Sequence, residues 1–132
     1  MKSILLLTAS LLLVTQMASA APLDDYRAEA KAADPSFSDF SAEKGKAFFL
    51  ENHTGGKPET PSCTSCHTKD PKTAGQTRAG KAIEPMALSV SPTRYSDKDK
   101  VEKWFRRNCN SVLGRACSAL EKGNFITFMQ TQ

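Results

Sequence analysis

Apolar positions recur at helical spacing in several stretches of the chain, and residues that start or stop helices bound each stretch. In LDDYRAEAKAADPSF, Pro35 is expected to end a short helix, because the residue before a proline is pushed out of the helical region. The next stretch, SAEKGKAFFLENHTGGKP, is predicted to begin after Ser41 as N-cap and to end at Gly55 and Gly56. The N-terminal half therefore predicts two helices.

The C-terminal half predicts two further helices. In PTRYSDKDKVEKWFRRNC, Ser96 is the expected N-cap, and Val101 and Trp104 fall on one apolar face. In CSALEKGNFITFMQ, Ser118 and Glu121 have the spacing of a capping box, which marks the start of the last helix.

The middle of the chain shows a different pattern. No stretch alternates at period two for long enough to predict a sheet. Five prolines and four glycines lie between Thr54 and Thr93, and such a long irregular segment is unusual unless it wraps something. The pattern predicts an all-α fold of helices joined by long loops.

The first twenty residues resemble a secretory signal peptide. They carry one positive charge at Lys2, an apolar run over residues 4–14 and small residues that end at Ala20. The apolar run is too short to span a bilayer, and the alternative is an uncleaved N-terminal anchor. We expect residues 1–20 to be cleaved off and residues 21–132 to form one small periplasmic domain.

Charge and cysteine usage narrow the class of protein. The formal net charge is +4 and falls to +3 without Lys2, which is too mild to indicate nucleic acid as a partner or strong attraction to membranes. Export implies an oxidising compartment. Cys109 and Cys117, which stand outside any cofactor motif, are therefore interpreted first as a disulfide.

The other two cysteines form the motif Cys63-Thr64-Ser65-Cys66-His67, the C-x-x-C-H sequence of c-type haem attachment. Two thiols at this spacing can add to the two vinyl groups of one porphyrin, and the histidine can then coordinate the iron as proximal ligand. The alternatives are a thioredoxin-like redox pair and half a zinc site. The redox pair would need a βαβ context, and zinc would need a second closely spaced knuckle, and both are absent from the sequence.

One covalently bound haem also explains the long irregular segment, since loops can pack on a porphyrin in place of a protein core. Gly45 and Phe49 on one helix, with Phe125 and Phe128 on the last, suit a close helix crossing, although ordinary core aromatics would give the same pattern. The arrangement resembles class I cytochromes c, whose terminal helices cross beside the haem. Further candidates for contact with the haem or its propionates, each with a core or surface role as alternative, are Arg94, Tyr95 and Trp104.

The residues themselves leave several candidates for the sixth iron ligand. His53 lies in a polar loop, and Met129 lies on the expected core face of the last helix. Met86 follows a proline in a loop and is the alternative axial ligand of a simple electron carrier. The segment RRNCNSVLGRAC, where a class I chain places its ligand loop, contains no His or Met but offers Asn108 and Asn110.

The segments EKWFRRNC and ALEKGNF, with Cys117 between them, resemble the oxygen-binding cytochromes c of the sphaeroides haem protein (SHP) family. The resemblance implies an asparagine as sixth ligand, here Asn108, and a Cys109–Cys117 disulfide. It also implies a dihaem cytochrome c and a membrane cytochrome b as electron donors. The related cytochromes c-double-prime have a histidine directly before the first cysteine. That histidine is missing here, so bis-histidine ligation does not carry over.

The resemblance gives Asn108 a chemical role. An amide oxygen is a hard, weak ligand that tolerates ferric iron better than ferrous iron. Reduction would then release Asn108 and leave the iron open to oxygen, nitric oxide or similar small ligands. A residue that merely caps its own helix is the alternative for Asn108. For the whole chain the alternatives are a His67/Met86 electron carrier and a reductase of nitrogen oxides, although the sequence shows no distal general acid.

Overall fold

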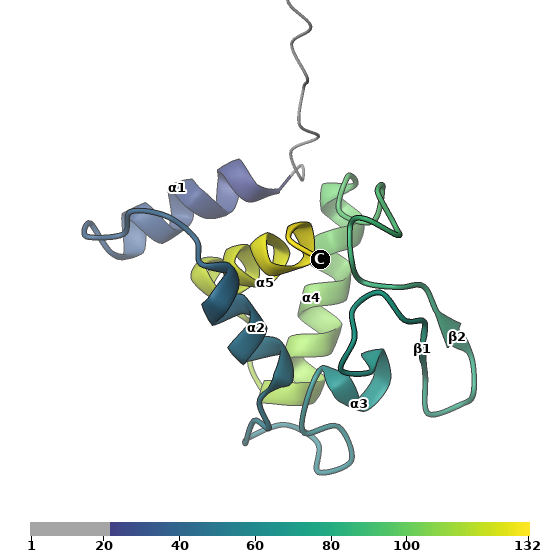
Figure 1. The fold of residues 1–132 in the computed structure, drawn as a ribbon. Coiled ribbons are helices and arrows are strands. Elements are labelled where there is room, and N and C mark those ends of the chain that lie inside the picture. The colour runs from purple at the N-terminus through teal and green to yellow at the C-terminus, as the bar shows by residue number, and fades with distance from the viewer. Residues whose placement is uncertain (1–21) are drawn as a thin grey trace, which may run out of the picture.

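The computed structural model describes residues 22–132, which form five α-helices and one small sheet (Figure 1). The predicted signal peptide of residues 1–20 lies outside the described residues. None of the helices in residues 22–132 is long and apolar enough to cross a membrane. The elements are α1 (Leu23–Ala33), α2 (Ala42–Leu50), α3 (Thr64–His67), β1 (Gly75–Gln76), β2 (Ala82–Ile83), α4 (Lys98–Leu113) and α5 (Ala119–Gln130).

The mainly helical fold that the sequence predicts is confirmed. The antiparallel pair β1–β2 is an addition, and it joins Gly75 to Ile83 and Gln76 to Ala82. Strands of two residues are too short to produce an alternating pattern, which is why the sequence does not reveal them.

Helices α2 and α5 cross at close range, as predicted from Gly45. A Cβ added at Gly45 would lie 2.0 Å from the carbonyl oxygen of Asn124, so only a glycine permits this approach. A hydrogen bond also joins the two helices at the crossing: the N–H of Ser41 donates to the Asn124 side-chain oxygen at 2.7 Å. Phe49 is fully buried at the crossing, with its ring centroid 6.0 Å from that of Phe125.

Several helix ends lie where the sequence predicts. Helix α1 ends at Ala33, ahead of Pro35. The Ser41 hydroxyl accepts a hydrogen bond from the N–H of Lys44 at the start of α2. Ser118 and Glu121 form both halves of the capping box at the start of α5.

Three expected boundaries are wrong. Helix α2 ends at Leu50, because the chain turns into extended conformation at Glu51 instead of continuing to the glycines. The N-cap of α4 is Asp97, whose carboxylate accepts from the N–H of Lys100, whereas the Ser96 hydroxyl donates to the Thr93 carbonyl.

The third correction concerns the segment that contains Asn108. The sequence indicates a loop there, but α4 continues past the first cysteine to Leu113 and ends at Gly114, whose φ of 68° is left-handed. Asn108 is therefore neither in a loop nor at the end of a helix.

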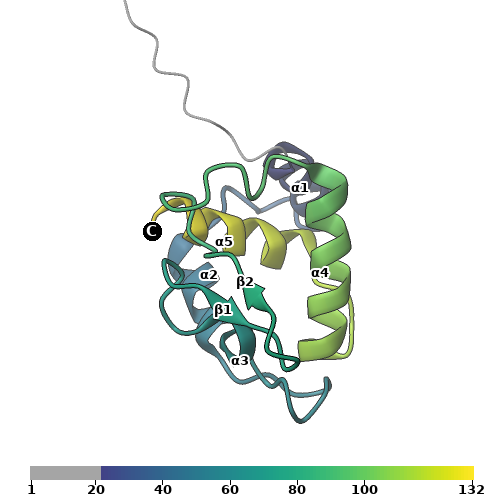
Figure 2. The ribbon, with the colours of Figure 1, turned by 90° about the vertical axis from the view of Figure 1, so that its right-hand side faces the viewer.

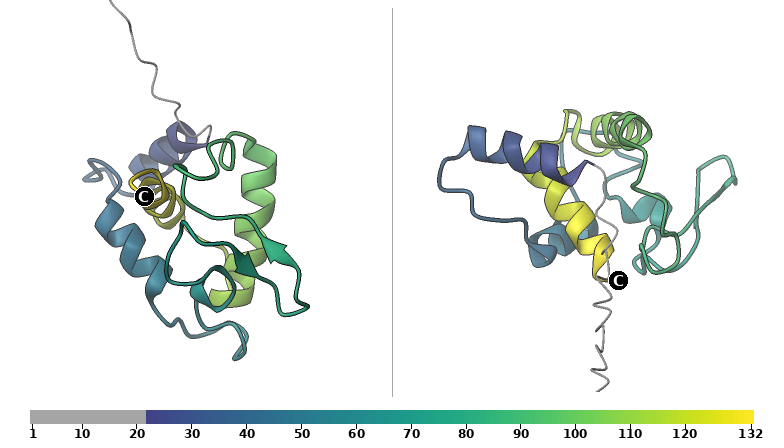
Figure 3. Two further views of the ribbon diagram at one scale, coloured as in Figure 1. Left: turned by 45° about the vertical axis from the view of Figure 1, so that its right-hand side comes forward. Right: turned by 90° about the horizontal axis from the view of Figure 1, so that it is seen from above.

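Helix α4 runs along one side of the molecule, beside the segment that contains α3, β1 and β2 (Figures 2 and 3). Its N-terminal half is tied to α1 and α5 through Glu102, which accepts from the Tyr26 hydroxyl and from the Lys122 ammonium at 2.8 Å. The Phe105 ring packs edge-on against Phe125 with centroids 5.5 Å apart. These contacts hold α4 in place over the side of the molecule that carries the C-x-x-C-H motif.

Candidate functional site

The C-x-x-C-H motif forms the single turn α3. The N–H groups of Cys66 and His67 both donate to the Cys63 carbonyl, at 3.3 and 3.1 Å. The Ser62 hydroxyl accepts from the N–H of Thr64 at 3.2 Å, which satisfies one of the free donors at the start of the turn. Because residues three and four positions apart share a helix face, the turn places both thiols and the imidazole on one side.

The His67 ring is partly buried and makes no hydrogen bond within residues 22–132. Its Nδ1 is buried without a partner. Burial, with a smaller contribution from the nearby Arg94 guanidinium, lowers the pKa of His67 to about 4. The ring is therefore neutral at physiological pH, as an iron ligand must be, and an unpartnered buried ring nitrogen indicates a partner other than the chain itself.

The two thiols are free and half-buried. Burial raises the pKa of the Cys63 thiol to about 11. A redox-active C-x-x-C pair has a lowered thiol pKa, so this environment does not support the thioredoxin-like alternative. Among residues 22–132, no three His, Cys, Asp or Glu side chains converge as zinc ligands would.

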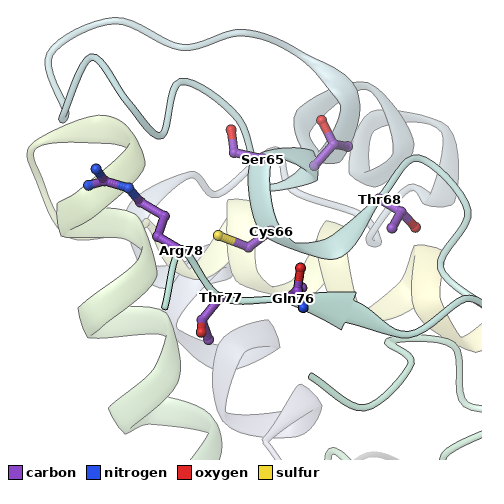
Figure 4. Close-up of a pocket in the computed structure, with 7 residues that line it drawn as sticks. Ser65, Cys66, Thr68, Gln76, Thr77 and Arg78 are labelled. Carbon is purple, nitrogen blue, oxygen red and sulfur yellow. The ribbon is translucent and has the colours of Figure 1, made fainter. Parts of the chain in front are cut away.

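An open hollow of about 390 Å³ lies against α3 and the first strand. Figure 4 shows the Cys66 sulfur pointing away from the α3 ribbon on the side where the Arg78 side chain extends. Residues that line the hollow are Thr64, Ser65, Cys66, Thr68, Gln76, Thr77 and Arg78. Of the two thiols only that of Cys66 lines this hollow, and His67 does not line it.

Asn108 shares a face of α4 with two buried residues. It follows Val101 by seven residues and precedes Val112 by four, and both valines are buried. Asn108 is nevertheless exposed, and its side chain makes no hydrogen bond in the part of the chain that the structure describes. Trp104, one turn earlier, is 47% exposed. The chain thus leaves the inward face of α4 uncovered at these two residues, which fits a bound porphyrin.

The other ligand candidates have structural partners. The His53 Nε2 lies 2.9 Å from the Phe48 carbonyl near the end of α2. Met129 is fully buried in the main core. Met86 is buried too, and its N–H donates to the carbonyl of Pro71 at 2.8 Å.

Cys109 and Cys117 form a disulfide in the structure, with Cα atoms 5.6 Å apart. Both are buried beside Val112 and Leu113, and the bridge connects α4 to the residue before the N-cap of α5. It therefore fixes the end of the helix that carries Asn108.

The Arg94 guanidinium lies near His67 and adds to the effect of burial in lowering the pKa of that ring. The sequence gives no sign of a contact between the end of α4 and the loop before Cys63, where the hydroxyls of Ser111 and Thr60 lie 2.9 Å apart. They are 51 positions apart in the chain, and neither belongs to a motif.

Comparisons with known proteins identify the class to which the chain belongs. Residues 35–129 match the family described as "Domain of unknown function (DUF1924)". The chain is 54% identical over 91 residues to cytochrome c-type protein SHP of Cereibacter sphaeroides, covering 69% of this chain and 70% of that protein. It is 38% identical over 108 residues to cytochrome c'' of Methylophilus methylotrophus, covering 81% of this chain and 75% of the relative.

Solved structures give the same result. The structure of oxidised SHP, described as an oxygen-binding cytochrome c, matches with a TM-score of 0.78 and 48% identity over 86% of this chain and 97% of that one. Oxidised cytochrome c'' from Methylophilus methylotrophus matches with a TM-score of 0.71 and 37% identity over 85% of this chain and 92% of that one.

Fold and site together define a c-type cytochrome with a covalently bound haem. The chain belongs to the SHP family of these cytochromes.

Proposed function

We propose that Cys63 and Cys66 attach the haem through thioethers and that His67 and Asn108 are the axial ligands of the ferric iron. The first three residues share one face of the α3 turn, and the His67 ring has no hydrogen-bond partner within residues 22–132. The observation that carries the assignment of Asn108 is its exposure on a helix face shared with the buried Val101 and Val112.

Met86 is a weaker candidate for the sixth position. Pro71, to which its N–H is bonded, follows His67 by only four residues, and the Met86 carbonyl accepts from the Tyr95 hydroxyl at 3.0 Å. These bonds hold Met86 to the loop that follows His67. Asn108 lies instead on α4, which runs beside the segment that contains α3 (Figure 2). A residue from a separate element suits the sixth position better than one tied to the loop of the proximal ligand.

The haem, when bound, supplies an iron that changes oxidation state and that takes a small diatomic ligand at an open position. The part of Asn108 is to occupy that position weakly. Its neutral amide oxygen suits ferric iron and has little affinity for ferrous iron, so the side chain leaves on reduction. No hydrogen bond within residues 22–132 holds the side chain of Asn108, so its departure breaks none.

The resulting function is an exported, periplasmic cytochrome that accepts an electron and then binds oxygen, nitric oxide or a similar ligand. Two relatives support it, since SHP is described as oxygen-binding and a solution structure of cytochrome c'' is described in terms of haem-ligand detachment. As electron donors we propose a dihaem cytochrome c and a membrane cytochrome b. A classified enzymatic reaction is not part of the proposal, because Asn108 cannot supply a proton as an acidic side chain could.

Spectroscopy of the holoprotein tests the assignment. Wild type should be low-spin when ferric and high-spin when ferrous, and the ferrous form should bind carbon monoxide rapidly. Asn108→Ala should be high-spin when ferric, or take water or hydroxide, with haem attachment intact. Asn110→Ala is the matched control, because this exposed asparagine lies two positions further along α4 and points in another direction. An unchanged ferric spectrum in Asn108→Ala would exclude the assignment.

A further inference from the structure

The C-terminal turn of α4 is bonded to the loop that leads to Cys63. The N–H of Lys57 donates to the Ser111 carbonyl at 2.7 Å, and the Thr60 hydroxyl donates to the same oxygen at 3.3 Å. The hydroxyls of Thr60 and Ser111 lie 2.9 Å apart. These three contacts join parts of the chain that are far apart in the sequence.

Helix geometry explains why the Ser111 carbonyl takes donors from outside. The last four carbonyls of a helix have no partner within it, and α4 ends at Leu113. The Asn110 carbonyl is satisfied by the N–H of Gly114 at 3.1 Å, whereas that of Ser111 is satisfied by the loop. Thr60 is buried, so its hydroxyl would be left without a hydrogen bond and away from water if the helix end moved away.

The loop and the helix end also touch at van der Waals range. A Cβ added at Gly56 would lie 2.3 Å from the Ser111 carbonyl oxygen, and one at Gly114 would lie 2.1 Å from the Gly55 carbonyl oxygen. Such backbone-to-backbone contact leaves no room for the helix end to move toward the loop. The hydrogen bonds oppose movement away from it.

The spacing of these contacts relates them to both sides of the iron site. Thr60 precedes Cys63 by three residues, and Ser111 follows Asn108 by three residues, about one helical turn. We propose that Thr60 and Ser111, with the Lys57 amide, hold the turn of α4 that carries Asn108 at a fixed distance from the segment that anchors the haem. This inference rests on the proposed ligation by Asn108.

Thr60 is in this view a positioning residue that acts through Ser111. Because a neutral amide is a weak ligand, its binding energy is too small to order a mobile helix turn as well. With the turn held, only the Asn108 side chain has to move when it leaves the iron and when it returns.

The test compares Thr60→Val, which keeps the shape but removes the hydroxyl, with Thr60→Ser, which keeps the hydroxyl. Electron paramagnetic resonance of the ferric holoprotein measures the high-spin fraction, in which Asn108 is off the iron. We expect this fraction to rise about fivefold in Thr60→Val, which corresponds to about 1 kcal/mol, and to stay at the wild-type value in Thr60→Ser. The ferrous spectrum should be the same in all three proteins, because Asn108 is already released.

Two results would overturn the inference: a wild-type high-spin fraction in Thr60→Val, or an equal rise in Thr60→Ser. A purely stabilising role would lower the melting temperature without changing the ferric spin state. If Thr60→Val fails to fold, Ser111→Ala replaces it, and the absence of any rise there overturns the inference. Failure of the proposed function is recognised separately, since Asn108→Ala alone would then leave the ferric spectrum unchanged.

Discussion

The N–H of Met86 donates to the carbonyl of Pro71 at 2.8 Å, which fixes the methionine to the loop that follows His67. The Met86 side chain is only 7% exposed and belongs to the main core, together with the Tyr95 ring. Packing in the core is enough to explain a methionine at this position, without a bond from its sulfur to the iron.

Met86→Ala should therefore lower stability without changing the ferric spectrum. Truncation of a buried methionine to alanine costs about 2–5 kcal/mol of unfolding free energy. Denaturant unfolding measures that loss, and the ferric absorption spectrum should remain low-spin. If Met86→Ala loses the low-spin ferric spectrum while Asn108→Ala keeps it, Met86 is the sixth ligand and the protein is a simple electron carrier.

Covalent attachment predicts a result for the two thiols of α3. Extraction with acidified organic solvent should leave haem on the wild-type chain, since thioether bonds survive denaturation. A Cys63→Ala/Cys66→Ala variant should lose all of its haem in the same extraction. If wild type also releases its haem, the attachment through these cysteines is wrong.

The bridge between Cys109 and Cys117 should be present in protein isolated from its native compartment. Alkylation without reductant, followed by mass spectrometry, should label neither cysteine. A Cys109→Ser/Cys117→Ser variant should lose roughly 2–3 kcal/mol of unfolding free energy, the value for closing a ring of about nine residues. Two labelled thiols in the untreated protein would contradict the bridge.

Gly45→Ala should destabilise the protein by roughly 1–3 kcal/mol, because its new methyl group would meet the Asn124 carbonyl and force α2 away from α5. Denaturant unfolding gives the difference. Lys46→Ala is the control, since this neighbour on the same helix is exposed and its replacement should change stability little. Equal effects of the two substitutions would show that the crossing tolerates a side chain.

Glu121 gives a pH-dependent prediction. The Arg115 guanidinium, 2.7 Å away, lowers the pKa of this carboxyl below its ordinary value. The ion pair therefore stabilises the fold at neutral pH, and this contribution is lost as the pH falls through the folded-state pKa. Glu121→Gln, which can still form the capping box, should be less stable than wild type by up to about 1 kcal/mol near neutral pH. The difference between the two proteins should shrink as the pH falls through the folded-state pKa of Glu121, and a constant difference would contradict the ionic origin.

Much of the fold could be predicted because its signals are local. Pro35 ends α1, Ser118 with Glu121 starts α5, and Gly45 marks the crossing of α2 with α5. The end of α4 was missed, because the stop signal at Gly114 stands beyond a polar segment that suggested a loop.

For the site, sequence motifs identified residues but not their surroundings. C-x-x-C-H identified two thiols and an imidazole at the spacing of haem attachment, and the structure adds that they lie in the single turn α3. The uncovered inward face at Asn108 could not be predicted, because it depends on how α4 packs against distant parts of the chain. The Thr60–Ser111 contact was equally hidden, since hydroxyls that meet across 51 positions leave no periodic pattern.

The bond between Ser41 and Asn124 spans 83 positions and joins the N-cap of α2 to the middle of α5. Closing a loop costs chain entropy, but the cost rises only slowly with the length of the loop. The segment between these two residues, which contains the C-x-x-C-H motif, can therefore be long and irregular at little further cost in stability.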